Sequence, residues 1–213
     1  MIRLINGLGY AQHSDELDQM FRLRKRAFAD RLNWKVGVFG DYEIDEYDMM
    51  KPLYVLSMDE DNKRVLGSLR LLPTTGPNML ADVFSDLLPE GQPYRSPVVW
   101  ESSRYCVDTT STNKTSKSGF NDSTAELLLA LCEIGIAAGL EFIVTVIDLR
   151  MERILRRLNC IGDRIGQPKF YGDVTAVAGH WETNEEMLQR LRRVSGVSHS
   201  VLENSEILQS LVA

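Results

Sequence analysis

The sequence predicts an α/β protein, a three-layer αβα sandwich in which helices cover both faces of a mixed central sheet. Segments with the three-to-four-residue period of amphipathic helices alternate along the chain with short apolar runs typical of strands. Hydrophobic residues make up 44% of the 213 residues and charged residues 25%, as in soluble globular proteins. Because no repeat or linker divides the sequence, we expect residues 1–213 to form a single domain.

The first half of the chain predicts one long helix and three strands. The helix is expected over residues 15–32, where apolar residues recur at spacings of three and four, with Ser14 as its N-cap. Two apolar runs flank a polar turn at residues 59–62, which is the signature of a β-hairpin. The predicted strands are residues 2–5, 53–58 and 65–72, and residues 31–50 are expected to be irregular.

The second half predicts further alternation of strands and helices. Residues 73–97 hold most of the prolines and are expected to form a loop with a short helix near residues 80–88. The polar segment 109–122 is expected to be a mobile loop. The remaining strands are predicted at 98–107, 142–147 and 175–180, and the remaining helices at 123–139, 150–158 and 184–194.

Composition excludes several functional classes. A net charge of −6 argues against a nucleic-acid partner. Three scattered cysteines, without a C-x-x-C pair or a nearby histidine cluster, argue against a disulfide framework and against a zinc site, and favour a reducing compartment. No metal site is expected. The N-terminal residues lack the apolar stretch of a signal peptide, and the longest apolar run, residues 134–147, is too short to span a bilayer. We therefore expect a cytoplasmic protein without a membrane anchor.

One arginine of the first predicted helix occupies an apolar position. Arg24 lies four residues after Met20 and four before Phe28, on the apolar stripe itself. A buried guanidinium without a carboxylate partner costs several kcal/mol, so this placement predicts acidic partners. The alternative is a long side chain that extends from the edge of the stripe to solvent.

Three more charges lie in predicted strands. Arg70 is flanked by leucines, and Glu101 and Arg104 share one strand. In a regular strand these last two side chains face opposite sides of the sheet, whereas a bulge at residues 102–103 would bring them to one face. Four charges at positions expected to be apolar indicate a functional site.

Charge is also segregated along the sequence. Residues 41–48 hold five acids and no base, whereas residues 146–170 hold six bases and three acids. The first segment suits a cation and the second an anion. The simpler alternative for each segment is an ordinary solvated charge run.

These residues together resemble the signature of a known family, the autoinducer synthases of the LuxI type, which make N-acyl-homoserine lactones. The similarity extends from the first helix to Arg104, and it is looser beyond residue 110. A set of eight residues at defined spacing is far more specific than a short motif. The eight positions are Arg24, Phe28, Trp34, Asp45, Asp48, Arg70, Glu101 and Arg104.

The resemblance implies a fold related to the GNAT acetyltransferases and a two-substrate reaction. An acyl thioester, usually on acyl carrier protein, would donate its acyl group to S-adenosylmethionine (SAM). The products would be the lactone, methylthioadenosine and free carrier, a route to a quorum-sensing signal. SAM would be a substrate, so no cofactor is expected. Residues 1–50 would form the SAM-binding part and residues 120–213 the part that binds the acyl chain and the carrier.

The resemblance also implies roles for individual residues. Phe28 and Trp34 would pack around SAM, Arg104 would hold its carboxylate, and Asp45 would lie near its sulfonium. Ser103, Phe84 and Thr145 would complete the substrate-binding set, and Arg24, Asp48 and Arg70 would join Glu101 in the catalytic group. A threonine at 145 would favour 3-oxo-acyl chains through its hydroxyl, although threonine is also an ordinary strand residue.

Glu101 is the best candidate for a general base. The amine of SAM has a reference pKa of ~8, so a base assists its attack on the thioester near neutral pH. Burial would raise the pKa of Glu101, whereas Arg70 and Arg24 would lower it. An equally open alternative makes Glu101 the structural hub of a network with Arg24, Asp48 and Arg70.

The predicted helix 150–158 suggests how the donor docks. Its apolar residues fall on one face, and its arginines fall on the other, where they suit an acidic acyl carrier protein, with acyl-CoA as a possible alternative donor. An ordinary amphipathic helix would show the same pattern. Helix 123–139 and strand 142–147 could line an acyl tunnel, with Trp100 and Trp181 lining it or belonging to the core. The four arginines are Arg150, Arg153, Arg156 and Arg157.

Three other functions fit the sequence less well. A general GNAT acyl-CoA transferase needs a glycine-rich pyrophosphate turn, and the nearest string, which begins at Arg64, lies at a strand start and ends in Leu69. A Rossmann methyltransferase fails because Gly7 and Gly9 lack the third glycine. A non-enzymatic binding module would leave the charges at apolar positions unexplained.

Overall fold

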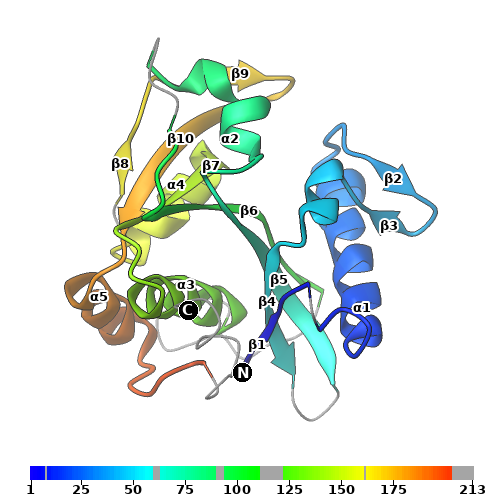
Figure 1. Cartoon of the computed structure of the whole chain (residues 1–213), viewed down its shortest axis with the longest axis horizontal. Helices are drawn as coiled ribbons and strands as arrows, with labels where there is room; N and C mark the ends of the chain where they lie inside the picture. The colour runs from blue at the N-terminus through cyan, green and yellow to red at the C-terminus, as the bar shows by residue number, and fades with distance from the viewer. Residues whose placement is uncertain (8, 60–62, 90–93, 111–121, 161, 203–213) are drawn as a thin grey trace.

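The computed structural model describes residues 1–7, 9–59, 63–89, 94–110, 122–160 and 162–202. One mixed sheet runs through the molecule in the order β1-β4-β5-β6-β7-β10-β8, and β9 also pairs with β10 (Figure 1). Its strands are β1 (Ile2–Ile5), β4 (Leu53–Asp59), β5 (Arg64–Pro73), β6 (Val99–Val107), β7 (Phe142–Asp148), β8 (Asp163–Arg164), β9 (Lys169–Tyr171) and β10 (Val174–Glu182).

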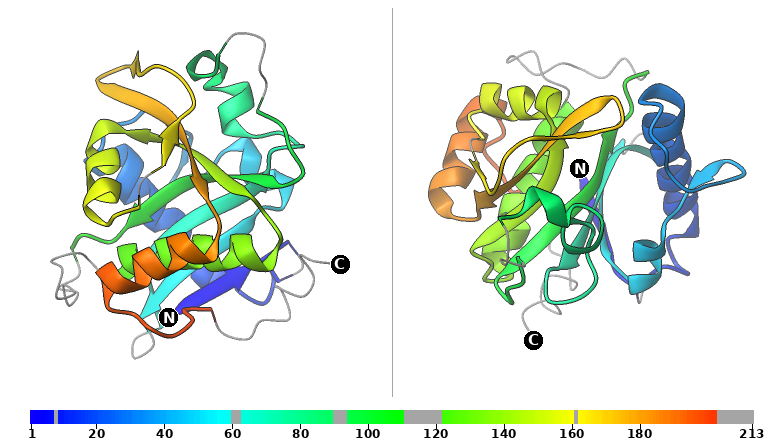
Figure 2. Two further views of the ribbon diagram at one scale, coloured as in Figure 1. Left: turned by 90° about the vertical axis from the view of Figure 1, so that its left-hand side faces the viewer. Right: turned by 90° about the horizontal axis from the view of Figure 1, so that it is seen from above.

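Helices cover both faces of this sheet, so the predicted three-layer sandwich is confirmed (Figure 2). The first face carries α1 (Ser14–Lys25) with its π-helical extension η1 (Arg26–Arg31), and then α2 (Met79–Asp82) and η3 (Ser85–Leu87). The second face carries α3 (Asp122–Ala137), α4 (Leu149–Arg157) and α5 (Glu185–Ser195). In the described part of the chain, no helix is long and apolar enough to cross a membrane.

Alternation along the strands divides the hydrophobic core between the two faces. In β4, Tyr54 and Leu56 pack with the residues of α1, while Leu53 and Val55 pack with those of α3. The period of two expected for strands buried on both sides is therefore present. Each fully buried leucine or valine contributes roughly 1.5–3 kcal/mol of hydrophobic stabilisation. Both faces of the sheet are therefore mainly apolar, and the polar site lies among these apolar residues.

A β-bulge in β6 decides which way Arg104 points. Arg70 pairs with Ser103 and Ser68 pairs with Cys106, so β6 has one more residue than β5 between these pairs. Arg104 lies at that point with φ of 54°, in the left-handed region that few non-glycine residues adopt. The bulge turns its side chain to the face that carries Arg70. The sequence-based alternative of a bulge was therefore right, but the bulge lies one to two residues after the expected position.

The strands β6 and β7 form the one parallel pair of the described sheet and soon separate. They pair only from Val99 with Phe142 to Glu101 with Val144. Beyond these residues β6 stays paired with β5 and β7 stays paired with β10, but β6 and β7 no longer pair with each other. The sheet is therefore opened at its centre, next to Glu101.

The structure corrects several details of the sequence prediction. The first α-helix ends at Lys25 and continues as a π-helix, and Ser14 is its first helical residue rather than its cap. Residues 31–50 are not wholly irregular, since they form the hairpin β2 (Val38–Phe39) and β3 (Tyr42–Glu43) and the 3-10 helix η2 (Glu46–Met50). Short strands β8 and β9 were not predicted. Most of the predicted mobile loop 109–122 and of the turn 59–62 lies outside the described residues.

Candidate active site

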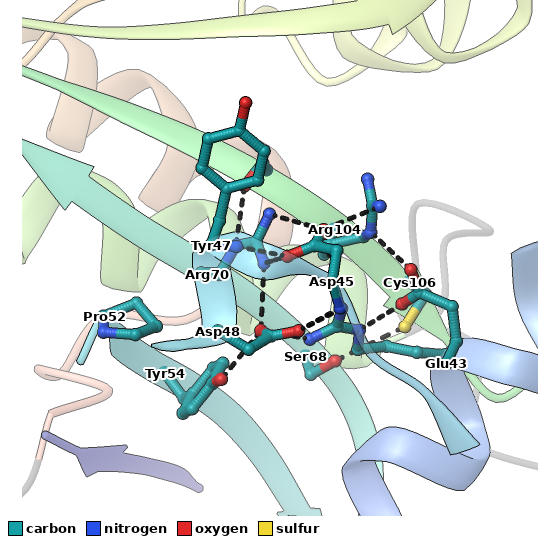
Figure 3. Close-up of polar contacts among 12 residues, drawn as sticks. Glu43, Asp45, Tyr47, Asp48, Pro52, Tyr54, Ser68, Arg70, Arg104 and Cys106 are labelled. Atoms are coloured by element: carbon teal, nitrogen blue, oxygen red, sulfur yellow. Dashed lines mark hydrogen bonds and ion pairs between the residues drawn. The ribbon is translucent and has the colours of Figure 1, made fainter. Parts of the chain in front are cut away.

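Six charged side chains, four of them buried and two half-buried, form a closed ring on the first face of the sheet (Figure 3). Three guanidinium groups alternate with three carboxylates, so every member contacts at least two members of opposite charge, and Arg24 and Asp45 also lie 4.0 Å apart across the ring. We call this set the charge ring, and it has no net formal charge. Its members in order are Arg24, Glu43, Arg104, Asp45, Arg70 and Asp48.

Arg24 holds the first part of the ring from helix α1. Its Nε donates to Glu43 Oε2 at 2.6 Å, and its two terminal nitrogens donate to the two oxygens of Asp48 at 2.8 and 3.0 Å. The side chain is 1% exposed, so the alternative in which it extends to solvent is wrong. Such bidentate, charge-assisted pairs are among the stronger hydrogen bonds in proteins.

Arg70 closes the ring from strand β5. Its Nη1 donates to Asp45 at 2.5 Å and to Asp48 at 2.9 Å, and its Nη2 donates to the other oxygen of Asp45 at 3.0 Å. Its Nε donates to Ser103 Oγ at 3.1 Å. The Tyr54 hydroxyl adds a hydrogen bond to Asp48 at 2.8 Å. All of these groups lie on the face that the strand period assigns to Arg70.

Arg104 completes the ring from the bulge of β6. Its Nε donates to Glu43 at 3.0 Å, and its Nη2 lies 2.7 Å from Asp45. Its remaining terminal nitrogen, Nη1, contacts the thioether sulfur of Met79 at 3.2 Å. A thioether is a weak acceptor, so this corner of the ring can accept a better partner.

The ring sets the protonation of its members. Burial alone would raise the pKa of Asp48, but hydrogen bonds and charge from Arg24, together with the charge of Arg70, hold it well below its usual range. Burial alone would lower the pKa of Arg24 and of Arg70, but hydrogen bonds and charge from the neighbouring carboxylates raise both. Asp48, Arg24 and Arg70 are therefore ionised at neutral pH.

Glu101 lies on the same face and does not belong to the ring. Its carboxylate accepts hydrogen bonds from the backbone N–H groups of Met79 at 2.9 Å and Leu80 at 2.6 Å, at the start of α2. The hypothesis that Glu101 is the hub of the arginine network is wrong. Burial raises its pKa to about 7, although those two amides and the charges of Arg70 and Arg104 act to lower it.

Two aromatic residues of the predicted site flank the ring. Phe28 and Trp34 stack with their ring centres 5.3 Å apart, and the guanidinium of Arg104 lies 5.6 Å from the ring of Phe28. Within the described part of the chain, the buried Trp34 Nε1 has no hydrogen-bond partner. Phe84 packs farther along the same face, edge-on to Tyr171 at 5.0 Å.

A cavity of about 60 Å³ lies on the opposite face of the sheet, between α3, α5, β7 and β10. Thr145 and Ile143 of β7 line it, with Trp181 of β10 and Leu128 of α3. Ser102 also lines it, although the neighbouring Glu101 faces the ring. Strand β6 thus separates the two regions. The other tryptophan considered for a tunnel, Trp100, packs against the core and is not among the described lining residues.

The four arginines of α4 lie away from both regions. Arg150, Arg153, Arg156 and Arg157 are all exposed, while Leu155 and Leu158 on the other face are buried. The predicted amphipathic arrangement is confirmed. Arg164 of β8 joins this surface through two hydrogen bonds to Glu152, at 2.8 and 2.7 Å.

Sequence reasoning missed several residues of the site, above all Glu43. This side chain is fully buried and bridges Arg24 and Arg104. The signal was present, because residues 43 and 45 alternate in the acidic segment and fall on one side of an extended chain. Met79 and Tyr47, whose ring centre lies 5.5 Å from the guanidinium carbon of Arg70, were also missed. Nothing in their local sequence marks them.

Comparison with known proteins decides the family. The model of the autoinducer synthase family matches residues 9–191. The chain belongs to the autoinducer synthase family. The acyltransferase class and the synthesis of an acyl-homoserine-lactone signal that the sequence predicts are therefore confirmed.

Individual autoinducer synthases agree with this assignment. An acyl-homoserine-lactone synthase of Agrobacterium fabrum is 41% identical over 170 residues, which cover 80% of each chain. One from Pseudomonas aeruginosa is 34% identical over 169 residues, covering 79% of this chain and 83% of that one.

Solved structures of autoinducer synthases share the fold. LasI superposes with a TM-score of 0.78 at 27% identity, covering 96% of this chain and 98% of its own. The CoA-dependent synthase BjaI, solved with SAM and isopentyl-CoA, gives a TM-score of 0.84 over 99% of this chain and 98% of its own. At 23% identity that second likeness shows the fold alone.

The charge ring predicts that neutralising one inner carboxylate destabilises this synthase strongly. Asp48→Asn leaves Arg24 and Arg70 without their shared counter-charge, and breaking a buried pair in this way costs about 3–5 kcal/mol. The free energy of unfolding in urea measures the loss. The exposed neighbour Glu46 provides the matched control, since Glu46→Gln should change stability by less than ~0.5 kcal/mol. Equal effects of the two substitutions would contradict the buried ring.

Proposed function

We propose that the open side of the charge ring binds SAM and that Glu101 accepts the proton of its α-amine. Asp45 and Arg104 are the least buried ring members, with side chains 14% and 10% exposed, whereas the other four are at most 3% exposed. They are also the two residues that the family resemblance assigns to SAM. The single observation that carries the proposal is this open corner beside a buried glutamate whose pKa is about 7.

Arg104 is suited to hold the carboxylate of SAM. Its Nη1 contacts only the sulfur of Met79 among the hydrogen-bond partners that the described residues provide. A carboxylate would replace this weak acceptor with a charge-assisted hydrogen bond. The stacked Phe28 and Trp34 would bind the remainder of the ligand, because aromatic faces attract a sulfonium cation and the unpaired Trp34 Nε1 can donate to an acceptor.

Glu101 has the properties of a base for the first step. A pKa of about 7 leaves a substantial carboxylate fraction at neutral pH and matches an amine with a reference pKa of ~8 better than an ordinary glutamate does. Proton transfer to Glu101 frees the nitrogen lone pair, which attacks the thioester carbonyl. The new C–N bond replaces the C–S bond, and the thiol leaves with a proton.

The second step closes the lactone. The carboxylate oxygen of SAM attacks its own γ-carbon, the C–S bond of the sulfonium breaks, and methylthioadenosine leaves with the electron pair. Because the sulfonium is already a good leaving group, the protein mainly has to fold the chain into the ring-closing pose. We assign that task to Arg104 and to the aromatic pair.

The acyl chain is assigned to the cavity on the other face of the sheet. The opening between β6 and β7 next to Glu101 would let the thioester carbonyl meet the amine while the chain extends toward Thr145 and Leu128. Residues 1–50 then provide most of the SAM part and residues 120–213 the acyl part of a single domain. We assign to the Thr145 hydroxyl, which belongs to the lining of this cavity, a hydrogen bond to a 3-oxo group.

Acyl carrier protein is the donor that the surface of α4 favours. Four exposed arginines, joined by Arg164, form a basic surface on a chain whose net charge is −6. Such a surface steers an acidic partner through long-range electrostatics. Acyl-CoA is the second candidate, because a structural neighbour is CoA-dependent. We propose a cytoplasmic location, where both substrates arise and the three free cysteines stay reduced, and no cofactor, nucleic acid or membrane anchor.

A donor screen tests the proposed function. Purified protein with SAM and a panel of acyl-carrier and acyl-CoA thioesters should release methylthioadenosine and an extractable lactone in equal amounts. Carrier-bound donors should give the higher kcat/KM, and their advantage should shrink with rising salt because surface charges are screened within ~10 Å at 0.1 M. Mass spectrometry of the product and chromatography of methylthioadenosine measure both. No lactone from any donor would contradict the proposal.

Charge reversal on α4 separates the two donor classes. Arg153→Glu combined with Arg157→Glu should raise the KM for carrier-bound donors, since electrostatic docking is lost. The kcat should stay close to that of the unchanged protein, because α4 lies away from the ring. An equal effect on a short acyl-CoA would show that the basic surface recognises something other than the carrier protein.

The raised pKa of Glu101 predicts a distinctive pH dependence. Protonated Glu101 cannot accept a proton, so kcat should rise with pH through about 7 and level off above it. Glu101→Gln should lower kcat by about 100-fold or more and abolish this rise. A group with a raised folded pKa also favours folding below that pKa, so stability should fall between pH ~4.5 and ~7 in the parent and less in the variant.

A purely structural role for Glu101 gives the opposite pattern. The glutamine would then lower the midpoint of thermal unfolding while the rise of kcat near pH 7 persisted. Glu101→Asp keeps a carboxylate and should retain the pH-dependent rise at a reduced rate, which distinguishes loss of the base from loss of the fold.

A further inference from the structure

One wall of the cavity is a single large side chain held in place by its surroundings. We infer that Trp181 sets the length of the longest acyl chain that the enzyme accepts. Its indole forms the wall of the cavity on the solvent side, where the end of a long acyl chain would meet it. The inference rests on the proposed function, in which this cavity holds the acyl chain. Trp181 would be the residue that determines the specificity for acyl-chain length.

The indole of Trp181 is fixed by contacts on two sides. Its Nε1 donates to the carbonyl oxygen of Cys160 at 3.2 Å. The backbone approaches it so closely at Gly162 and Gly179 that a Cβ at either position would lie 2.4 and 2.8 Å from ring atoms. A ring held by a hydrogen bond and by two close backbone contacts cannot swing aside to admit a longer chain.

The strand register explains how the ring reaches the cavity. Trp181 pairs with Ile143 and Gly179 pairs with Thr145, and all but Gly179 line the cavity. Because residue 179 has no side chain, the indole can lie back along β10 over the position opposite Thr145. The missing side chain at Gly179 therefore leaves room for the indole against β10, and the ring stays out of the space where the acyl chain would lie.

Many of the other residues that line the cavity belong to the core, although the lining also includes the exposed Glu182. Leu155, Cys160, Met187 and Leu191 are each between 4% and 6% exposed, and all line the cavity. Trp181 is the largest side chain of the lining and is only half-buried. Substitution there opens the cavity outward, whereas truncation of the buried leucines would cost about 2–5 kcal/mol each in packing. We therefore expect Trp181, and not the buried leucines, to limit the length of the acyl chain.

Two substitutions should shift the acyl preference in opposite directions. Trp181→Leu removes the wall and should favour longer donors. Gly179→Ala places a methyl group against the ring and should push the indole into the cavity, which favours shorter donors. A methylene in an apolar pocket changes kcat/KM by about 10- to 200-fold, so each shift should reach tenfold or more.

The measurement is the kcat/KM for a series of acyl donors that differ by two carbons, with SAM at saturation. For Trp181→Leu, the ratio of the first donor beyond the wild-type limit to the best wild-type donor should rise at least about tenfold. For Gly179→Ala, the ratio of the longest accepted donor to a short one should fall by a similar factor. Thermal unfolding confirms that each variant is folded, and Trp181→Phe replaces Trp181→Leu if the leucine variant is not.

The double variant is the matched control. Without the indole, the methyl group at residue 179 no longer meets a ring, and its remaining close contact is the backbone oxygen of Asp163 on β8 at 3.2 Å. Gly179→Ala should therefore leave the ratio within about threefold in the Trp181→Leu background. An unchanged ratio in Trp181→Leu would overturn the inference, as would a full effect of Gly179→Ala in that background. Failure of the proposed function is seen separately, as a wild-type protein that releases no methylthioadenosine with any donor.

Discussion

The buried alternation of three guanidinium groups and three carboxylates is the constraint on which the rest of this structure depends. Each charge, taken alone, would cost several kcal/mol to remove from water, and the whole ring is tolerable only because every member is paired twice. Its members come from α1, β3, η2, β5 and β6. Loss of one charge would therefore affect the attachment of five elements.

This constraint explains how residues 31–50 are held. The segment has few buried apolar side chains, and several of its hydrophobic residues, including Phe39 and Met49, are exposed. Its attachment to the sheet depends mainly on Glu43, Asp45 and Asp48. These three acids therefore have two tasks. They attach residues 31–50 to the sheet, and they give the site its negative charge while one side of the ring stays accessible.

Strand β6 connects the ring to the acyl cavity. Glu101 faces the ring and Ser102 faces the cavity, as the period of two requires, and the bulge at Arg104 returns the next charge to the first face. The separation of β6 from β7 opens the sheet at that point. The fold therefore brings a base, a cationic anchor and an apolar cavity together around three residues of one strand.

Much of this could be predicted from sequence, for reasons that are local. Arg24 on an apolar stripe and Arg70 among leucines conflict with their surroundings, and the conflict is resolved only by buried acids. The fold class follows from alternation of helix and strand periods. Other features depend on tertiary contacts. The hydrogen-bond partners of Glu101 are two backbone N–H groups, 21 and 22 residues away in the sequence, and the identity of a residue does not reveal where its backbone N–H will point.

The position of the bulge could not be predicted for a related reason. Arginine is not a residue that favours positive φ, so the left-handed conformation of Arg104 is imposed by the ring and not by its own preference. Glu43 was hidden in an acidic run that a solvated loop would also show. Its burial depends on the β2–β3 hairpin, which is too short to have a detectable period.

In the proposed reaction, the ring and the cavity receive the two substrates on opposite faces of β6, and the reacting atoms meet at Glu101. The most direct measurement is a crystal structure with SAM and a non-cleavable acyl donor in which a methylene replaces the thioester sulfur. In that structure we expect the SAM carboxylate on Arg104, its amine within hydrogen-bond reach of Glu101 directly or through one water, and the acyl chain against Trp181. SAM bound away from the ring, or an acyl chain outside the cavity, would contradict it.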